Sequence, residues 1–228
     1  MAESAPNKKI VVSTVTIAAI LLACAAAWSL SNRKLGLKDQ LQERRNVKSP
    51  IATGKTDETS AKKLDSPVPP FRFASANGGK LGLEDLKGKV WVAEFIFTSC
   101  AGYCPEMSQM TQLLQERTTD LPDLNFVSFS VDPDRDSLLA LKEYAAEYKA
   151  NNERWHFLRA AQKDVQALGR HGFFLLNDTD ALMHSKKCAL VDRNGHIRGY
   201  FDGAGAERVS DFKALEVMAR ELYAEKGE

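Results

Sequence analysis

Cysteine and net charge are both scarce in this sequence of 228 residues. Its four cysteines are too few for a disulfide-stapled scaffold, which a domain of this size does not need. The 31 lysines and arginines balance 30 aspartates and glutamates to leave a formal charge of +1, and no basic stripe is interleaved with aromatic residues. The composition therefore excludes nucleic-acid binding by bulk electrostatics. A hydrophobic content of 44% suits one globular domain with accessory segments.

Charge is absent altogether from one stretch near the N-terminus, residues 10–30. About 20 such residues are enough to cross the ~30 Å hydrocarbon core of a bilayer. We therefore expect an N-terminal tail at residues 1–9 and a retained transmembrane anchor at 10–30, with Trp28 as an interfacial residue. The alternative is a lipoprotein anchor, because "LLAC" resembles a lipoprotein cleavage box and would make Cys24 the acylated residue.

The next stretch, residues 31–70, is polar, rich in Lys, Ser and Thr, and poor in aromatic residues. Such a composition cannot bury a core, so it predicts a flexible linker. Regular hydrophobic periodicity starts at Phe71, and we expect the globular domain to span residues 71–228.

Within this domain, strand and helix patterns alternate. The run VWVAEFIF at 90–97 is almost continuously apolar, as is typical of a central strand covered on both faces. A right-handed crossover makes the first two buried strands parallel, and an Asn-Gly turn near the C-terminus predicts an edge hairpin. This order predicts an α/β domain of thioredoxin-like fold, a central sheet flanked by helices. The expected strands are at 71–75, 90–97, 124–132, 154–160 and, as the hairpin, 186–202; the expected helices are at 105–118, 136–150, 162–172 and 206–226.

Two of the four cysteines lie close together, in "SCAGYC" at 99–104. Cys100 and Cys104 follow the central strand, and Pro105 indicates that a helix begins there. Helix N-termini favour thiolates, so we expect a lowered thiol pKa in this loop. A pair of thiolates suits either disulfide chemistry or a soft metal ion.

The position of one histidine favours a metal site over disulfide chemistry. Thioredoxin-like reductases place a cis-proline opposite their cysteines, just before the edge hairpin, but the last proline here is Pro133. His184 stands at that place instead, so Cys100, Cys104 and His184 together would form a Cys2His site.

Three blocks, "FTSCAGYCPEMSQM", "VSFSVDPDRDSLLALKEYAAEY" and "MHSKKCALVDRNGHIRGYF", resemble the signature segments of the Sco/SenC copper chaperones. The resemblance covers Phe71 to about Phe201 and implies a membrane-anchored thioredoxin-fold protein that assembles the dinuclear copper centre of cytochrome c oxidase. It implies copper, as Cu(I) and/or Cu(II), on Cys100, Cys104 and His184. The implied partner is the copper-site subunit of the oxidase or another copper carrier. Met183 departs from the family, which often has an acidic residue beside the histidine.

The same cysteines also suit an alternative function, thiol–disulfide exchange, in which one attacks and the other resolves the mixed disulfide. Other chemistry-bearing residues have structural interpretations. Spacing predicts core or surface positions for Met107, Met110, Cys188, His156, His171 and His196, and helix capping for Asp132 and Asp134.

The sequence gives conflicting signals about the membrane topology. Lys8 and Lys9 precede the apolar run, whereas six basic residues follow it between Arg33 and Lys48 and favour a cytoplasmic domain. Long domains, however, translocate largely regardless of charge. The family resemblance implies an extracytoplasmic domain, on the bacterial periplasmic side or in the mitochondrial intermembrane space, and we expect that arrangement.

Overall fold

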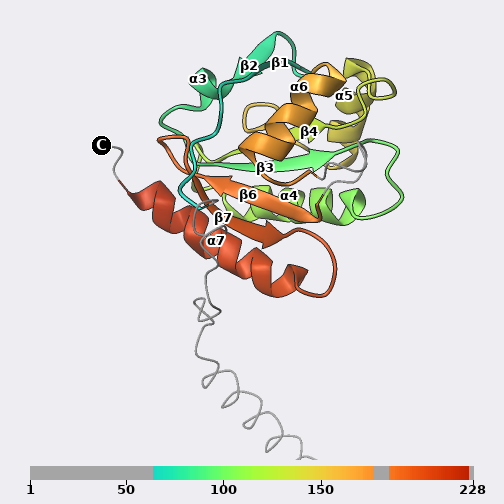
Figure 1. The fold of residues 1–228 in the computed structure, drawn as a ribbon. Helices are drawn as coiled ribbons and strands as arrows, with labels where there is room; N and C mark the ends of the chain where they lie inside the picture. The colour runs from blue at the N-terminus through green and yellow to red at the C-terminus, as the bar shows by residue number, and fades with distance from the viewer. Residues whose placement is uncertain (1–63, 177–184, 226–228) are drawn as a thin grey trace, which may run out of the picture. The chain divides into compact units, whose positions relative to one another are not determined.

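The computed structural model describes residues 64–176 and 185–225. The described chain forms one seven-stranded mixed sheet, in the order β2-β1-β5-β4-β3-β6-β7, with helices on both faces (Figure 1). The strands are β1 (Arg72–Ser75), β2 (Lys80–Gly82), β3 (Trp91–Ile96), β4 (Asn125–Ser130), β5 (Trp155–Arg159), β6 (Lys187–Val191) and β7 (Ile197–Asp202). The helices are α3 (Leu83–Leu86), α4 (Cys104–Arg117), α5 (Leu138–Glu147), α6 (Gln162–Ala167), a π-helical turn (Leu168–Gly172) and α7 (Arg208–Ala224).

The predicted sheet is confirmed in its main features. Strands β3, β4 and β5 are parallel, and every residue of β3 and β4 is buried, as continuous apolar runs require. β6 and β7 form the antiparallel hairpin beside β3, closed by the Asn-Gly turn. Because β3 and β4 run in the same direction, the loops that follow them leave the same edge of the sheet, where ligands of α/β proteins bind.

The sheet separates two cores. On one face, α6 and the π-helical turn cover a cluster that includes Trp91, Phe95 and Phe129. On the other, α4, α5 and α7 cover a cluster that includes Cys104 and Cys188. Figure 1 shows α6 on one side of the sheet, with α4 and α7 on the opposite side. The cysteine helix is therefore packed on the sheet.

Helix ends agree with the expected boundaries to within a few residues, with one correction. The N-cap of α5 is Ser137, whose hydroxyl accepts the backbone N–H of Ala140 at 3.1 Å. The capping roles expected for Asp132 and Asp134 are thus wrong, because both precede the cap within the loop. Asp132 instead accepts the backbone N–H groups of Arg135 and Asp136 at its own carbonyl, which closes a turn.

Residues 64–70, at the end of the expected linker, lie against the β6–β7 hairpin. The Asp65 N–H donates to the Ile197 carbonyl at 2.7 Å, and the Val68 N–H donates to the Gly195 carbonyl at 2.9 Å. Val68 is buried. No helix within the described ranges is long and apolar enough to span a bilayer. The predicted anchor at 10–30, Cys24, Met183 and His184 all lie outside the described residues.

Candidate metal and redox site

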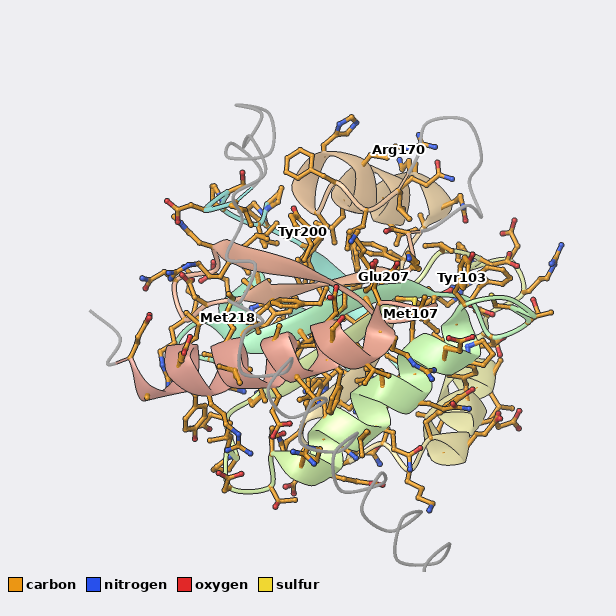
Figure 2. The ribbon with its side chains drawn as sticks, turned by 90° about the horizontal axis from the view of Figure 1, so that it is seen from below. Tyr103, Met107, Arg170, Tyr200, Glu207 and Met218 are labelled. Carbon is orange, nitrogen blue, oxygen red and sulfur yellow. The ribbon has the colours of Figure 1, made fainter. Side chains whose placement is uncertain are left out.

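The cysteines lie at the edge of the sheet where β3 ends. β3 ends at Ile96, and α4 begins with Cys104, so residues 97–103 form the connecting loop. Tyr103 is the N-cap, and this residue is 52% exposed. In Figure 2, Tyr103 lies at the N-terminal end of α4, and Met107 lies one turn along the helix, beside the start of α7. The loop is thus open to solvent at its tip and closed where it enters the helix.

Cys100 is the more accessible of the two cysteines and is partly buried. Its Sγ accepts the backbone N–H of Gly102 at 3.3 Å, and its own N–H donates to the Phe97 carbonyl at 3.2 Å. A backbone N–H that points at sulfur stabilises negative charge there. The loop therefore presents a sulfur atom with an oriented hydrogen-bond donor.

Cys104 differs in that its side chain is fully buried, at 0% exposure. Burial raises the pKa of the Cys104 thiol, and its side-chain hydrogen bond with Cys100 adds to the rise, while a hydrogen bond with the Phe97 backbone opposes it. The lowered pKa expected from the helix N-terminus is thus wrong for Cys104, because loss of hydration outweighs the helix dipole. The two side chains nevertheless interact directly, as a metal-binding or redox pair must.

A buried acid that the sequence analysis overlooked lies on the same face of the sheet. Glu94, in the middle of β3, is only 1% exposed. Its carboxyl group accepts the hydroxyl of Ser128 at 2.6 Å and that of Thr111 on α4 at 2.9 Å, and the Trp155 indole N–H donates to Ser128 at 2.8 Å. Burial raises the pKa of Glu94 despite these donors. The sequence signal for Glu94 was an acidic residue inside the otherwise apolar run VWVAEFIF.

A second overlooked acid lies in the loop after β4. Asp136 is fully buried and accepts hydrogen bonds from Thr98, two residues before Cys100, and from Ser130 at the end of β4. The sequence offered three acids in "DPDRD" but no means of telling which one bonds to Thr98.

The core positions predicted for Cys188, Met107 and Met110 are confirmed. Cys188 is buried, and its thiol donates to the Phe201 carbonyl at 3.5 Å. Met107 and Met110 are buried on α4. The three described histidines, His156 in β5, His171 in the π-helical turn and His196 in the hairpin, belong to three different elements.

The donor set fits a soft metal ion as far as it is described. No group of three His, Cys, Asp or Glu side chains able to hold a metal occurs within residues 64–176 and 185–225. The described part of the expected site is the thiol pair, reduced and without a disulfide. Thiolates are the ligands that Cu(I) prefers, whereas Mg²⁺ and Ca²⁺ require oxygen.

Comparison of the sequence with known protein families identifies a match. The SCO1/SenC family model matches residues 59–216. The chain belongs to the SCO1/SenC family. The SCO1 protein homologue of Bacillus subtilis is 34% identical over 165 residues, which are 68% of this chain and 86% of that protein. A Stutzerimonas stutzeri protein with the provisional name of copper-binding protein is 28% identical over 141 residues, 58% of this chain and 68% of its own length.

The fold agrees with the family assignment. A solved structure reported for a disulfide switch in BsSco, a member of the Sco family of cytochrome c oxidase assembly proteins, superposes with a TM-score of 0.62 at 29% identity. The match covers 71% of this chain and 95% of that structure. The mixed sheet with flanking helices is thus the thioredoxin-like fold of Sco proteins.

Proposed function

We propose that this protein is a membrane-anchored copper-binding assembly factor. In this function it carries copper for the dinuclear site of cytochrome c oxidase, to the copper-site subunit or to another carrier. The observation that carries the proposal is the interacting thiol pair at the sheet edge of a SCO1/SenC chain. The resemblance to copper chaperones and the name of the Stutzerimonas relative support it.

Copper is the cargo, and Cys100, Cys104 and His184 are its proposed ligands. Two thiolates and one imidazole suit three-coordinate Cu(I), and an added ligand would suit Cu(II). Each thiol must lose its proton to bind, so loading releases protons. Because burial raises the pKa of Cys104, the metal itself must displace that proton.

The decisive experiment compares two histidine variants of the full chain. His184→Ala should lower copper affinity by about tenfold or more, as loss of a ligand or its support does. His171→Ala is the matched control, because His171 is exposed in the π-helical turn beside Leu168 and Phe71, and it should retain full affinity. Equal affinities in His184→Ala and the unmodified chain, measured by competition with a chelator, would contradict the ligand assignment.

A second function is favoured by the unequal burial of the cysteines. An accessible Cys100 above a buried Cys104 is the arrangement of an attacking and a resolving thiol. Oxidation would join the two sulfurs, with loss of two protons and two electrons to a disulfide oxidant, and would abolish copper binding. Mass spectrometry after oxidation and alkylation should find both residues unlabelled; if both are alkylated, the redox proposal fails.

The membrane arrangement completes the proposal. The N-terminus would lie inside, residues 10–30 would span the membrane, and the tether would end before residue 64, because residues 64–70 lie against the β6–β7 hairpin. The copper domain would lie outside, where the oxidase copper centre matures. Alkaline phosphatase fused after Glu228 should be active, because it folds only where disulfides form. An inactive fusion beside an active cytoplasmic reporter would reverse the topology and weaken the oxidase assignment.

A further inference from the structure

The loop after β4, residues 131–137, is fixed by its neighbours. The Gln162 side-chain amide donates to the Val131 carbonyl at 2.9 Å. The Arg159 guanidinium donates twice to the Pro133 carbonyl, at 3.1 Å from Nε and 2.7 Å from Nη2. Ser137 ends the loop as the N-cap of α5. Contacts from β5 and α6 thus hold the loop backbone in one conformation.

Asp136 turns from this fixed loop toward the cysteine loop. Its Oδ1 accepts the Thr98 hydroxyl at 2.6 Å, and the Thr98 backbone N–H lies 3.2 and 3.3 Å from the two carboxyl oxygens. Its Oδ2 accepts the Ser130 hydroxyl at 2.6 Å. The side chain is fully buried, so water does not compete for these bonds. Both the backbone and the side chain of Thr98 are therefore held by one carboxyl group.

Thr98 is the second residue of the cysteine loop. The last described rung between β3 and β4 joins the Val131 N–H to the Ile96 carbonyl at 2.9 Å, and the chain then leaves the sheet. Thr98 follows two residues later, and Cys100 two residues after that. A sulfur atom that must bind a metal or attack a disulfide needs a fixed position, and a surface loop fixes one only through such anchors.

We propose that Asp136 is a positioning residue, which acts through Thr98 to hold Cys100 in its reactive position. It does not touch the sulfur. This role deepens the proposed function and rests on it, because copper binding and thiol exchange at Cys100 are the activities that it supports.

Four variants of the full chain test this role. Thr98→Val removes the hydroxyl but keeps the shape and the backbone N–H, whereas Thr98→Ser keeps the hydroxyl. Ser137→Ala is the matched control, because it removes a hydrogen bond from the same region without touching the cysteine loop. Asp136→Asn keeps the size of the side chain but cannot accept both hydroxyls. Each variant is assayed for copper affinity, for the equilibrium of the Cys100–Cys104 disulfide with glutathione, and for its urea midpoint.

We expect Thr98→Val to lose about tenfold in copper affinity, the lower end of the range for groups that support a metal ligand. It should also change the disulfide equilibrium, and Thr98→Ser should restore both. Asp136→Asn should change both quantities in the same direction as Thr98→Val; should it not fold, the Thr98 pair decides alone. Ser137→Ala should lower the urea midpoint only.

The proposal is overturned if copper affinity and the disulfide equilibrium of Thr98→Val equal those of the unmodified chain. It is also overturned if Ser137→Ala changes both quantities as much as Thr98→Val does. A chain that binds no copper, but whose disulfide equilibrium responds to Thr98→Val, would refute the copper function and retain the positioning role.

Discussion

Replacing Glu94 by glutamine should remove a pH-dependent instability from the protein. Burial raises the pKa of Glu94 above its ordinary value of 4.5, so the folded state keeps a proton that the unfolded chain has already released. Over that interval the unfolded state binds one proton fewer, and the free energy of unfolding falls by about 1.4 kcal/mol for each pH unit. The stability contributed by the protonated acid is complete below pH 4.5 and is lost as the pH rises through the folded-state value.

The hydrogen bonds around Glu94 indicate that glutamine fits. The Trp155 indole can only donate, and it donates to Ser128, so the Ser128 hydroxyl must donate to Glu94. A glutamine carbonyl can accept that bond. Its amide N–H can donate to the hydroxyl of Thr111, which lies 2.9 Å from the other carboxyl oxygen. Glutamine thus reproduces the neutral acid without its titration.

The assay is urea unfolding of the full chain under reducing conditions, from pH 5 to pH 8. The difference in free energy of unfolding between Glu94→Gln and the unmodified protein should grow as the pH rises. Subtraction at each pH removes other titrating groups, such as His156, whose pKa burial lowers. Glu116→Gln, which removes the same charge from an exposed position on α4, should keep the original slope. Parallel curves for Glu94→Gln and the unmodified protein would refute the reasoning.

Three further predictions follow from burial. A brief pulse of alkylating agent should label Cys100 before Cys104 and Cys188, which are fully buried, and peptide mapping that finds Cys104 labelled first would contradict this. Cys188→Ala should lower the free energy of unfolding by about 1–2 kcal/mol, as small core truncations do, yet leave copper affinity unchanged in a chelator competition. A methyl group at Gly203 would lie 2.9 Å from Cγ of the buried Met107, so Gly203→Ala should cost about 1–3 kcal/mol in urea unfolding, and an unchanged midpoint would exclude this contact.

The centre of the fold was predictable because β3 and β4 are buried on both faces. The run at 90–97 has almost no polar residues, and the structure places six of its residues in β3, all buried. The Asn-Gly turn likewise located the β6–β7 hairpin, and Cys188 lies in the core as predicted for a small apolar side chain. Hydrophobic patterns of this kind reflect burial in the folded protein, so the strands predicted from them agree with the structure.

The electrostatics of the site were not predictable in the same way. A helix N-terminus stabilises a nearby negative charge by about 0.3–1 kcal/mol. Removal of a charge from water costs several kcal/mol. The sequence shows that Cys104 precedes a helix, but only packing shows that its side chain is fully buried, and the larger effect then decides the direction of its pKa.

The contact of Asp136 with Thr98 was equally hidden, since it depends on a backbone path that Arg159 and Gln162 hold in place. Sequence proximity could not rank Asp132, Asp134 and Asp136. Only the folded loop places one of the three carboxyl groups against Thr98.

The unequal burial of the two cysteines also bears on how a carrier of copper would release its cargo. Ligand exchange between two proteins proceeds one bond at a time, and the incoming ligand must reach the metal from solvent. Cys104 is covered by the core, whereas Cys100 lies in the loop whose tip carries the exposed Tyr103. An acceptor's thiol would therefore approach from the side of Cys100, and the bond from copper to Cys100 would be exchanged first. Cys104 would hold the metal until the transfer is complete, because burial raises the pKa of its thiol and a bound metal would neutralise its thiolate.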